Sequence, residues 1–417
     1  MTEAYAYVAL AAMLAVVLWR PHGWGPPLGA AVAVLVAVAA GLVDRDDPRQ
    51  AALVLWRPFI TLTSIMLMTS AAERLGVIER LAAFIEPRTR GPVRHAFRIT
   101  FVTSAVVAAV LSNDAAILLL TPTVLALIRA VYPRRHGKFL QAFAFAVFAG
   151  AGVAPLVVSN PMNLVVAERA GIGFNRYALT MIPVALAGWL VTYALLARLF
   201  RAPLVDEAPA LGAWAAPRAL TPAARLVVIV LGVVLASYPV AAYLGGPLWA
   251  VAAAGAAVCT AASVGAGVRL RALASGVSWN VFPFLGGVLV LALAMQHAGV
   301  VDRLASLFVP GPARLPIIGA VAAAGSALLN NHPMAILDAL ALERTVGAGH
   351  VDVLAALIGG DLGPRLLPSG SLAGILWMDV LRRHDVDVGV GTFARVGVVL
   401  TVPTLLVSIL VLWLVGA

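Results

Sequence analysis

Charged residues are scarce in this chain. Asp, Glu, Lys and Arg together make up 12% of its 417 residues, about half the share of a typical soluble domain. Hydrophobic residues make up 62%, and the mean hydropathy is +0.98. A soluble fold cannot hide that much apolar surface behind so few polar residues. The apolar runs are long enough to cross a hydrocarbon layer of about 30 Å, so the sequence predicts an all-α polytopic membrane protein.

Reactive and metal-binding residues are also few. The single cysteine, Cys259, excludes a disulfide framework and a Cys-based zinc site within one chain. The sequence contains no Walker motif, no nucleophile elbow and no His/Cys/carboxylate set at metal-ligand spacing. These absences argue against ATP hydrolysis by this chain and against an intramembrane hydrolase. We therefore expect a protein that is not an enzyme, with no catalytic residue, cofactor or metal site.

Acidic residues are outnumbered by basic ones, 19 to 29, which gives a net charge of +10. The basic residues stand in short loops and form no stripe, so we expect a lipid bilayer as partner and no nucleic acid. When the loops are assigned to alternate sides of a membrane, 20 basic residues fall on one side and 8 on the other, with Arg365 left inside an apolar run. The richer side is predicted to be cytoplasmic. We expect a multi-pass protein of the cytoplasmic (inner) membrane, with both termini on the periplasmic or extracellular side.

Two apolar runs, at about 95–131 and about 313–342, are too long for one span and too short for two spans with a loop. The first is broken by Ser112-Asn113-Asp114 and the second by Asn330-Asn331-His332-Pro333. A polar break inside an apolar run predicts a re-entrant hairpin that enters the membrane and turns back.

Two further runs carry helix-breaking residues, at 155–163 and 359–371. Proline and glycine interrupt the helical hydrogen-bond ladder, so discontinuous helices are expected there. The pattern also repeats, because segments at Trp56 and Ser112 resemble segments at Trp279 and Asn330, and the offset stays within 218–223 residues. Each half would hold five spans and one hairpin, an odd number that inverts the second half, as in secondary transporters. The predicted parts are an N-terminal repeat at 1–205, a cytoplasmic linker at 206–221 and a C-terminal inverted repeat at 222–417.

Polar residues at membrane depth are functional candidates, since an ionisable side chain there costs on the order of 2.5–3.5 kcal/mol. Four clusters qualify, at the two hairpin tips and the two helix breaks, and the residues alone leave plainer roles open. Asp114 is a helix cap, a proton carrier or both. Asn160 and Asn163 either satisfy the unwound backbone or hold a small polar solute. His332 is either a cap-like residue or a group that titrates near neutral pH.

The fourth cluster, at 359–371, combines charge with a broken backbone. Asp361 and Arg365 stand four residues apart, near enough for an ion pair if the segment is helical. Such a pair would be structural. Ser369 and Ser371 add hydroxyl groups beside it.

Several of these stretches carry a family resemblance. They are Ser112-Asn113-Asp114 continuing to Thr121-Pro122, Pro155 to Asn160 with Asn163, Asn330-Asn331 with Pro333, Trp279-Asn280-Val281-Phe282 and, most specific, Ile358-Gly359-Gly360-Asp361-Leu362-Gly363-Pro364-Arg365 continuing to Trp377. In these the chain resembles the arsenical-pump membrane permeases, the arsenite/antimonite efflux carriers of the ion transporter superfamily. It departs from them at 150–154, where the family usually has an acidic residue with Thr or Ser. It departs again at His332 and Asp338, where small or apolar residues are expected.

The resemblance implies a scaffold part and a transport part that carries both hairpins, with the site between the hairpin tips. The cargo would be arsenite or antimonite as the neutral trihydroxide, which hydroxyl, amide and backbone groups can hold by hydrogen bonds. The candidate substrate-binding residues are Ser112, Asn113, Asn160, Asn163, Asn330, Asn331, Ser369 and Ser371. A neutral cargo draws no work from the membrane potential, so export against a gradient requires a coupled ion.

The expected coupling ion is the proton, and the candidate carriers are Asp114, Asp361 and His332. Asp114 is preferred because it is the acid placed deepest, at a hairpin tip where burial and a helix N-terminus act on proton affinity in opposite directions. The alternatives are a sodium/proton antiporter or a sodium-coupled anion (dicarboxylate-like) carrier of the same superfamily, and less favoured, an ion channel. A soluble ATPase subunit at the cytoplasmic face is a further partner that the sequence leaves open.

Overall fold

The computed structural model describes residues 2–19, 25–132, 137–205 and 219–416, and every regular element in those ranges is a helix. The α-helices of the first half are α1 Thr2–Trp19, α2 Pro26–Ala39, α3 Asp47–Arg74, α4 Val77–Thr89, α5 Val93–Val110, α6 Asn113–Val131, α7 Gly137–Gly150, α8 Pro161–Arg169 and α9 Phe174–Leu199. Those of the second half are α10 Pro222–Tyr243, α11 Leu248–Gly265, α12 Leu270–Ala274, α13 Val281–His297, α14 Val300–Ala305, α15 Arg314–Leu329, α16 Asn331–Arg344, α17 His350–Leu362, α18 Leu372–Arg383 and α19 Val390–Gly416. Short 3₁₀ turns stand at η2 Val157–Ser159, η3 Gly363–Arg365 and η4 Pro368–Gly370.

Seven of these helices are long and apolar enough to cross a membrane, namely α3, α5, α6, α9, α10, α11 and α19. Shorter apolar helices accompany them, at Glu3–Val17, α2, α7, α13 and α15. The prediction of an all-α, multi-pass membrane protein is confirmed.

The two predicted hairpins are formed by α5 with α6 and by α15 with α16. In the first, the arms of 18 and 19 residues are each long enough to span a membrane. We expected this run to be too short for two spans. It nevertheless holds two helices of spanning length, because the turn between them takes only residues 111–112. The arms of the second hairpin are shorter, with 16 and 14 residues.

The order of elements recurs along the chain. In each half an apolar helix, α3 or α13, is followed by a short helix, a hairpin, a broken helix and a long final helix. The junction of α3 with α4 and that of α13 with α14 each use a glycine in the left-handed region, Gly76 at φ 78° and Gly299 at φ 83°. The inverted relation of the halves and their boundaries remain predictions, and the linker at 206–221 lies largely outside the described residues.

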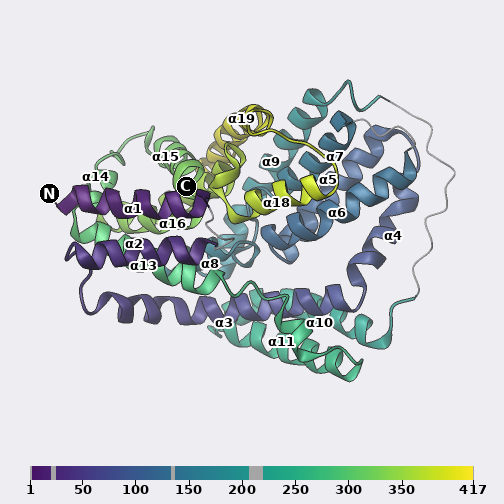
Figure 1. Cartoon of the computed structure of the whole chain (residues 1–417), viewed down its shortest axis with the longest axis horizontal. Coiled ribbons are helices and arrows are strands. Elements are labelled where there is room, and N and C mark those ends of the chain that lie inside the picture. The colour runs from purple at the N-terminus through teal and green to yellow at the C-terminus, as the bar shows by residue number, and fades with distance from the viewer. Residues whose placement is uncertain (1, 20–24, 133–136, 206–218, 417) are drawn as a thin grey trace.

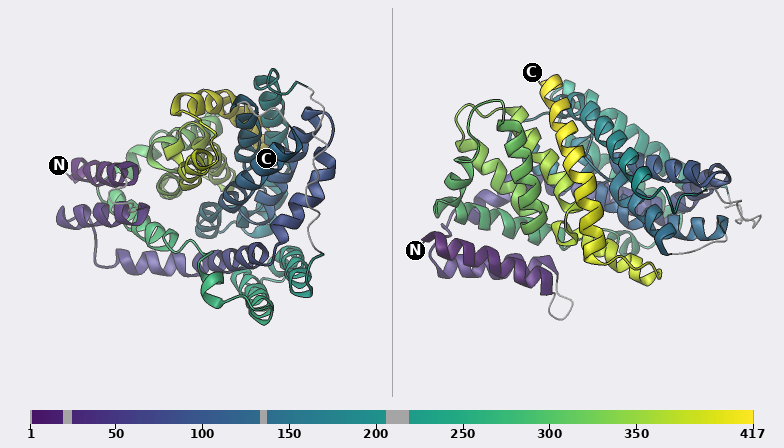
Figure 2. Two further views of the ribbon diagram at one scale, coloured as in Figure 1. Left: turned by 45° about the vertical axis from the view of Figure 1, so that its right-hand side comes forward. Right: turned by 90° about the horizontal axis from the view of Figure 1, so that it is seen from above.

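The helices form two packed groups (Figures 1 and 2). On one side α1 packs on α2 and α2 on α13, while α3 runs beneath them and contacts α10 and α11. On the other side α5, α6, α7 and α18 pack together around the aromatic rings of α7. There Trp377 of α18 lies with its ring centroid 5.2 Å from that of Phe145 and 4.8 Å from that of Phe148. The broken helices stand where the two groups meet.

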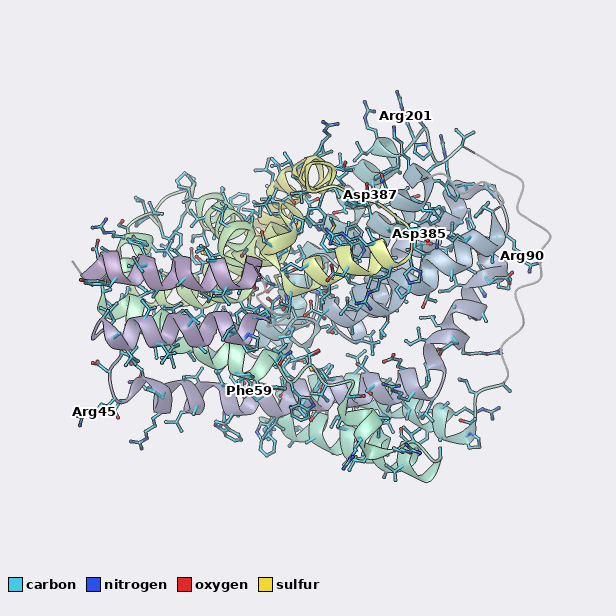
Figure 3. The ribbon with its side chains drawn as sticks, in the orientation of Figure 1. Arg45, Phe59, Arg90, Arg201, Asp385 and Asp387 are labelled. Atoms are coloured by element: carbon cyan, nitrogen blue, oxygen red, sulfur yellow. The ribbon has the colours of Figure 1, made fainter. Side chains whose placement is uncertain are left out.

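Charged side chains mark the two ends of the molecule. In Figure 3, Arg45 lies near one end of the long axis, and Arg90 and Arg201 lie toward the other end. The assignment of these ends to an outer and a cytoplasmic face, made from the Lys/Arg bias, stays a prediction. Between these ends run the apolar helices.

Candidate functional site

All four polar clusters meet at one small cavity of about 30 Å³. It lies between the two hairpin tips and the two helix breaks. Its polar lining residues are Asn113 and Asp114 of the first hairpin, Asn160 of the first break, Asn331 of the second hairpin, and Asp361, Arg365 and Ser371 of the second break. Residues up to about 260 positions apart in the chain are thereby brought to one point.

Four helices begin at this cavity, and a side chain caps each of them. Ser112 Oγ accepts from Ala115 N–H at the start of α6 at 3.1 Å, and Asn160 Oδ1 accepts from Met162 N–H at the start of α8 at 3.1 Å. The caps of the second half are Asn330 Oδ1 to His332 N–H of α16 at 3.4 Å and Ser371 Oγ to Gly374 N–H of α18 at 2.9 Å. Helix N-termini carry free N–H groups and a partial positive charge. The cavity is therefore rich in hydrogen-bond donors for an oxygen-bearing solute.

Asp361, on α17, is buried and accepts three hydrogen bonds from the first half of the chain. Its Oδ2 accepts from the backbone N–H of Ala154 at 2.9 Å and from Asn163 Nδ2 at 3.1 Å, and its Oδ1 accepts from Asn160 Nδ2 at 2.7 Å. Behind them the hydroxyl of Tyr177 accepts from Asn163 Nδ2 at 2.9 Å and donates to the carbonyl of Ala154 at 3.1 Å. This carboxylate joins the broken helices of the two halves.

Arg365 is also buried, and it binds other groups than Asp361. Its Nη2 donates to the carbonyl of Ala149 at 2.5 Å and its Nη1 to Thr192 Oγ1 at 3.2 Å. The structural ion pair expected from the four-residue spacing is not formed as a direct contact among the described residues. The reason is that α17 ends at Leu362 and the chain continues as a 3₁₀ turn, which removes the helical spacing. Arg365 instead places its charge at the C-terminal end of α7, where a cation is favourable.

Each hairpin tip is fastened to the helix break of its own half. Asn113 Nδ2 donates to the carbonyl of Gly152 at 3.2 Å, and Asn330 Nδ2 donates to the carbonyl of Ser369 at 3.3 Å. In the first half Ser159 Oγ adds a bond to the carbonyl of Ala109 at 2.7 Å. A hairpin and its neighbouring break are thus held as one unit.

Not every predicted residue lines the cavity. Ser112, Asn163, Asn330 and Ser369 lie outside its lining. Asn163 donates to the lining residue Asp361, Ser112 and Asn330 cap α6 and α16, and Ser369 accepts from Asn330 through its carbonyl. His332 is outside the cavity lining; it is buried with its ring against Phe284 of α13, edge to face at 5.7 Å between centroids, and its Nδ1 lies 3.3 Å from Asn330 Oδ1. Sequence reasoning missed Tyr177 and Thr192, which lie on α9 outside the polar breaks and carry no motif.

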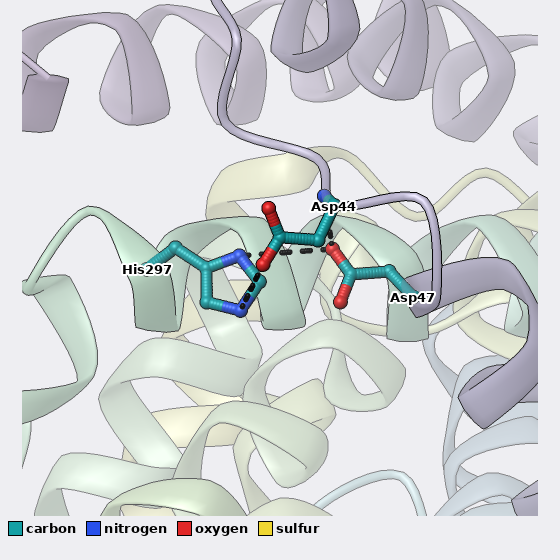
Figure 4. A group of neighbouring side chains, drawn as sticks. All are labelled: Asp44, Asp47 and His297. Carbon is teal, nitrogen blue, oxygen red and sulfur yellow. Dashed lines mark hydrogen bonds and ion pairs between the residues drawn. The ribbon is translucent and has the colours of Figure 1, made fainter.

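One group of metal-ligating residue types comes together among the described residues (Figure 4). Ligand atoms of Asp44, Asp47 and His297 lie within 4.8 Å of one another. Spacing in the sequence did not indicate this set, because His297 is remote from the two acids. Existing contacts account for all three: Asp47 Oδ2 accepts from Asp44 N–H at 2.8 Å, and the His297 ring nitrogens lie 3.6 and 3.7 Å from the carboxylates. We assign the group a structural role, joining the loop before α3 to the end of α13.

The arrangement is that of a membrane transporter: apolar helices, two of them broken at a buried polar cavity, with helical hairpins reaching in from both halves. The fold is similar to that of the Alcanivorax borkumensis YdaH transporter, whose crystal structure matches with a TM-score of 0.53 at 16% identity over 90% of each chain. A family model described as arsenical pump membrane protein matches residues 5–415. The chain therefore belongs to the arsenical pump membrane protein family, whose members are transporters and not enzymes.

Curated relatives extend over nearly the whole chain. An arsenical pump membrane protein of Escherichia coli is 28% identical over 407 residues, 95% of each chain. A putative arsenical pump membrane protein of Bacillus subtilis is 25% identical over 95% of this chain and 96% of its own. An uncharacterised transporter of Mycobacterium tuberculosis is 26% identical over 86% of each chain. The similarity thus includes both hairpins and both helix breaks.

Proposed function

We propose that this protein exports arsenite and antimonite, as neutral trihydroxides, across the cytoplasmic membrane. The observation that carries the proposal is the cavity at four helix N-termini, with the amides of Asn113, Asn160 and Asn331 and the hydroxyl of Ser371 in its wall. These groups and the free backbone N–H groups suit a cargo with three hydroxyls. The described cavity lining has no thiol, since Cys259 is buried in α11. A carrier that must release its cargo is better served by hydrogen bonds than by thiolate–metal bonds.

The size of the cavity bears on how transport proceeds. A volume of about 30 Å³ is close to the share of one water molecule in the liquid. A trihydroxide has four heavy atoms, so binding requires the hairpin tips to separate. Because each tip is bonded to its neighbouring break, we propose that hairpin and break move together against α3 and α13.

We propose the proton as coupling ion, carried by Asp114. Asp114 lines the central cavity and also a second cavity against α3, so a proton on it has access to two compartments of the molecule. Asp361 is a weaker candidate because three donors already hold it. His332 is weaker because it lies outside the lining of the cavity.

The test measures pH-gradient-driven arsenite accumulation in everted vesicles. We expect Asp114→Asn to abolish it while some downhill arsenite exchange and the expression level are kept. Asp385→Asn, an exchange of an exposed acid in the loop after α18, is the matched control and should accumulate arsenite normally. Undiminished accumulation by Asp114→Asn would move the assignment to Asp361 or His332.

The anion-carrier alternative calls for a cationic cavity. Here two carboxylates, Asp114 and Asp361, share the lining with a single guanidinium, Arg365, which favours a neutral cargo. Uptake of arsenite, antimonite, sodium and citrate measured side by side separates this alternative and the sodium/proton antiporter from the proposal. Saturable counterflow of labelled arsenite separates a carrier from a channel. Stimulation by a soluble ATPase would be seen as added uptake when that subunit and ATP are supplied.

A further inference from the structure

A second cavity, of about 140 Å³, lies between α3 and the first hairpin. Thr69, Ser70 and Glu73 of α3 form one wall, and Ser112 and Asp114 stand opposite them. The α3 residues that line it run from Leu62 to Glu73, a length of about 16 Å at the helical rise of 1.5 Å per residue. Glu73 is half-buried and stands one residue before the end of α3. The cavity thus extends from the end of α3 to Asp114, which it shares with the central cavity.

One wall of this cavity holds a hydroxyl without a partner. Ser70 is 2% exposed, and its Oγ makes no hydrogen bond within the described structure. The residue facing it is Gly276, where a Cβ would stand 2.2 Å from that oxygen. A buried hydroxyl without a partner costs free energy, and only a glycine at position 276 leaves room for it against this wall.

The charges along this cavity all have one sign. Glu73 and Asp114 are the charged residues among those described in its lining, and no Lys, Arg or His is among them. The neighbouring Arg74 is exposed and directs its Nη2 to Ser275 Oγ at 3.3 Å, outside the lining. Two carboxylates in a narrow space repel anions and leave neutral solutes unaffected.

We propose that this cavity is the access vestibule from the predicted cytoplasmic face, and that Glu73 makes it a filter that rejects anions. Neutral trihydroxides and protons pass to Asp114, whereas oxyanions such as arsenate and phosphate and carboxylates such as citrate are turned back. The assignment rests on the proposed function for the identity of the cargo. It gives Glu73 a role in selectivity, at a distance from the site where cargo is held.

The experiment uses the single cysteine of the chain. In a Cys259→Ala background, Ala115→Cys places one thiol in the vestibule wall. Everted vesicles are treated with a cationic and an anionic methanethiosulfonate of similar size. The rate at which each reagent labels Ala115→Cys is divided by the rate at which the same reagent labels a small thiol in solution, which corrects for intrinsic reactivity. We expect the cationic reagent to react about tenfold faster. Glu73→Gln should reduce that preference, with Asp114 beside the thiol keeping the remainder, and Glu79→Gln, which replaces an exposed acid on α4, should leave it unchanged.

Three results would overturn the filter: equal rates with both reagents, a preference unchanged by Glu73→Gln, or a thiol labelled only from the opposite face. A second measurement is competition, in which arsenate or citrate should inhibit arsenite uptake by Glu73→Gln more than uptake by the wild type. The labelling requires no transport, so it separates the two proposals. If arsenite transport is normal but labelling shows no charge selectivity, the vestibule proposal is rejected and the proposed function stands. If labelling is charge-selective but arsenite is not transported, the proposed function is rejected and the acidic passage stands.

Discussion

Replacing Asp361 by asparagine measures how firmly the two halves are joined at the cavity. Asparagine has one acceptor oxygen in place of two. If that oxygen takes the position of Oδ2, it keeps the bonds from Ala154 N–H and Asn163 Nδ2 in weaker, neutral form. Its NH₂ group then faces the NH₂ group of Asn160, where the native distance is 2.7 Å. One bond is lost and a contact between two donors replaces it.

The magnitude follows from these contacts. Hydrogen bonds to charged groups contribute about 1.5–3 kcal/mol and neutral ones about 0.5–1.5 kcal/mol. One lost and two weakened bonds lower the free energy of unfolding by about 3.5–6 kcal/mol, and the smaller cost of burying a neutral amide offsets part of this. A net loss of about 2–4 kcal/mol remains, which at about 1 °C per kcal/mol for a chain of 417 residues lowers the melting midpoint by roughly 2–4 °C.

The assay is thermal denaturation in detergent of Asp361→Asn beside the wild type. Asp385→Asn serves as control, because Asp385 is exposed and has φ 53°, a conformation that asparagine tolerates. The double variant Asn160→Asp/Asp361→Asn exchanges donor and acceptor and keeps a capping oxygen for α8, so we expect it to recover at least half of the lost midpoint. A wild-type midpoint for Asp361→Asn, or no recovery by the exchange, would refute the reasoning.

Two further substitutions test packing and cargo chemistry. Cys259→Ala should leave arsenite transport near the wild-type rate, because the thiol is buried in α11 away from the cavity lining; loss of transport with intact expression would indicate a metal–sulfur contact instead. Gly397→Ala should lower stability by about 2 kcal/mol or more, since a Cβ there would stand 1.7 Å from the carbonyl oxygen of Arg365. Gly391→Ala, on the same helix with open space around it, is the control, and equal melting midpoints for the two variants would contradict the described packing.

The hairpins and breaks are predictable because each is a local conflict in the sequence. A polar segment such as 112–114 between two apolar runs marks the turn between them. The first hairpin occupies Val93–Val131, close to the predicted 95–131. Proline and glycine at 155–163 and 359–371 break the helices at any depth. The helix α4 was not predicted, because its charged, amphipathic sequence resembles a loop between spans.

The contacts of the site depend on tertiary arrangement and were beyond local patterns. The backbone N–H of Ala154 carries no sequence signal, yet it donates to Asp361 from 207 residues away. Tyr177 lies in an ordinary apolar helix, and nothing nearby marks it as a partner of Asn163. The predicted Asp361–Arg365 ion pair required a continuous helix, but a 3₁₀ turn at Gly363–Arg365 changes the spacing of the two side chains. The sequence pattern therefore predicts which polar residues lie at membrane depth, whereas the contacts among them depend on how the helices pack.

The bonding of Asp361 also has a consequence for synthesis. Its three donors lie 207, 201 and 198 residues earlier in the chain. At about 5–20 residues per second, the ribosome needs about 10 to 40 s to reach the carboxylate after the first donor is made. Throughout that interval the nascent protein carries, at membrane depth, polar groups whose acceptor does not yet exist. A chain halted anywhere in that window has the three donors of this junction without the carboxylate that holds them.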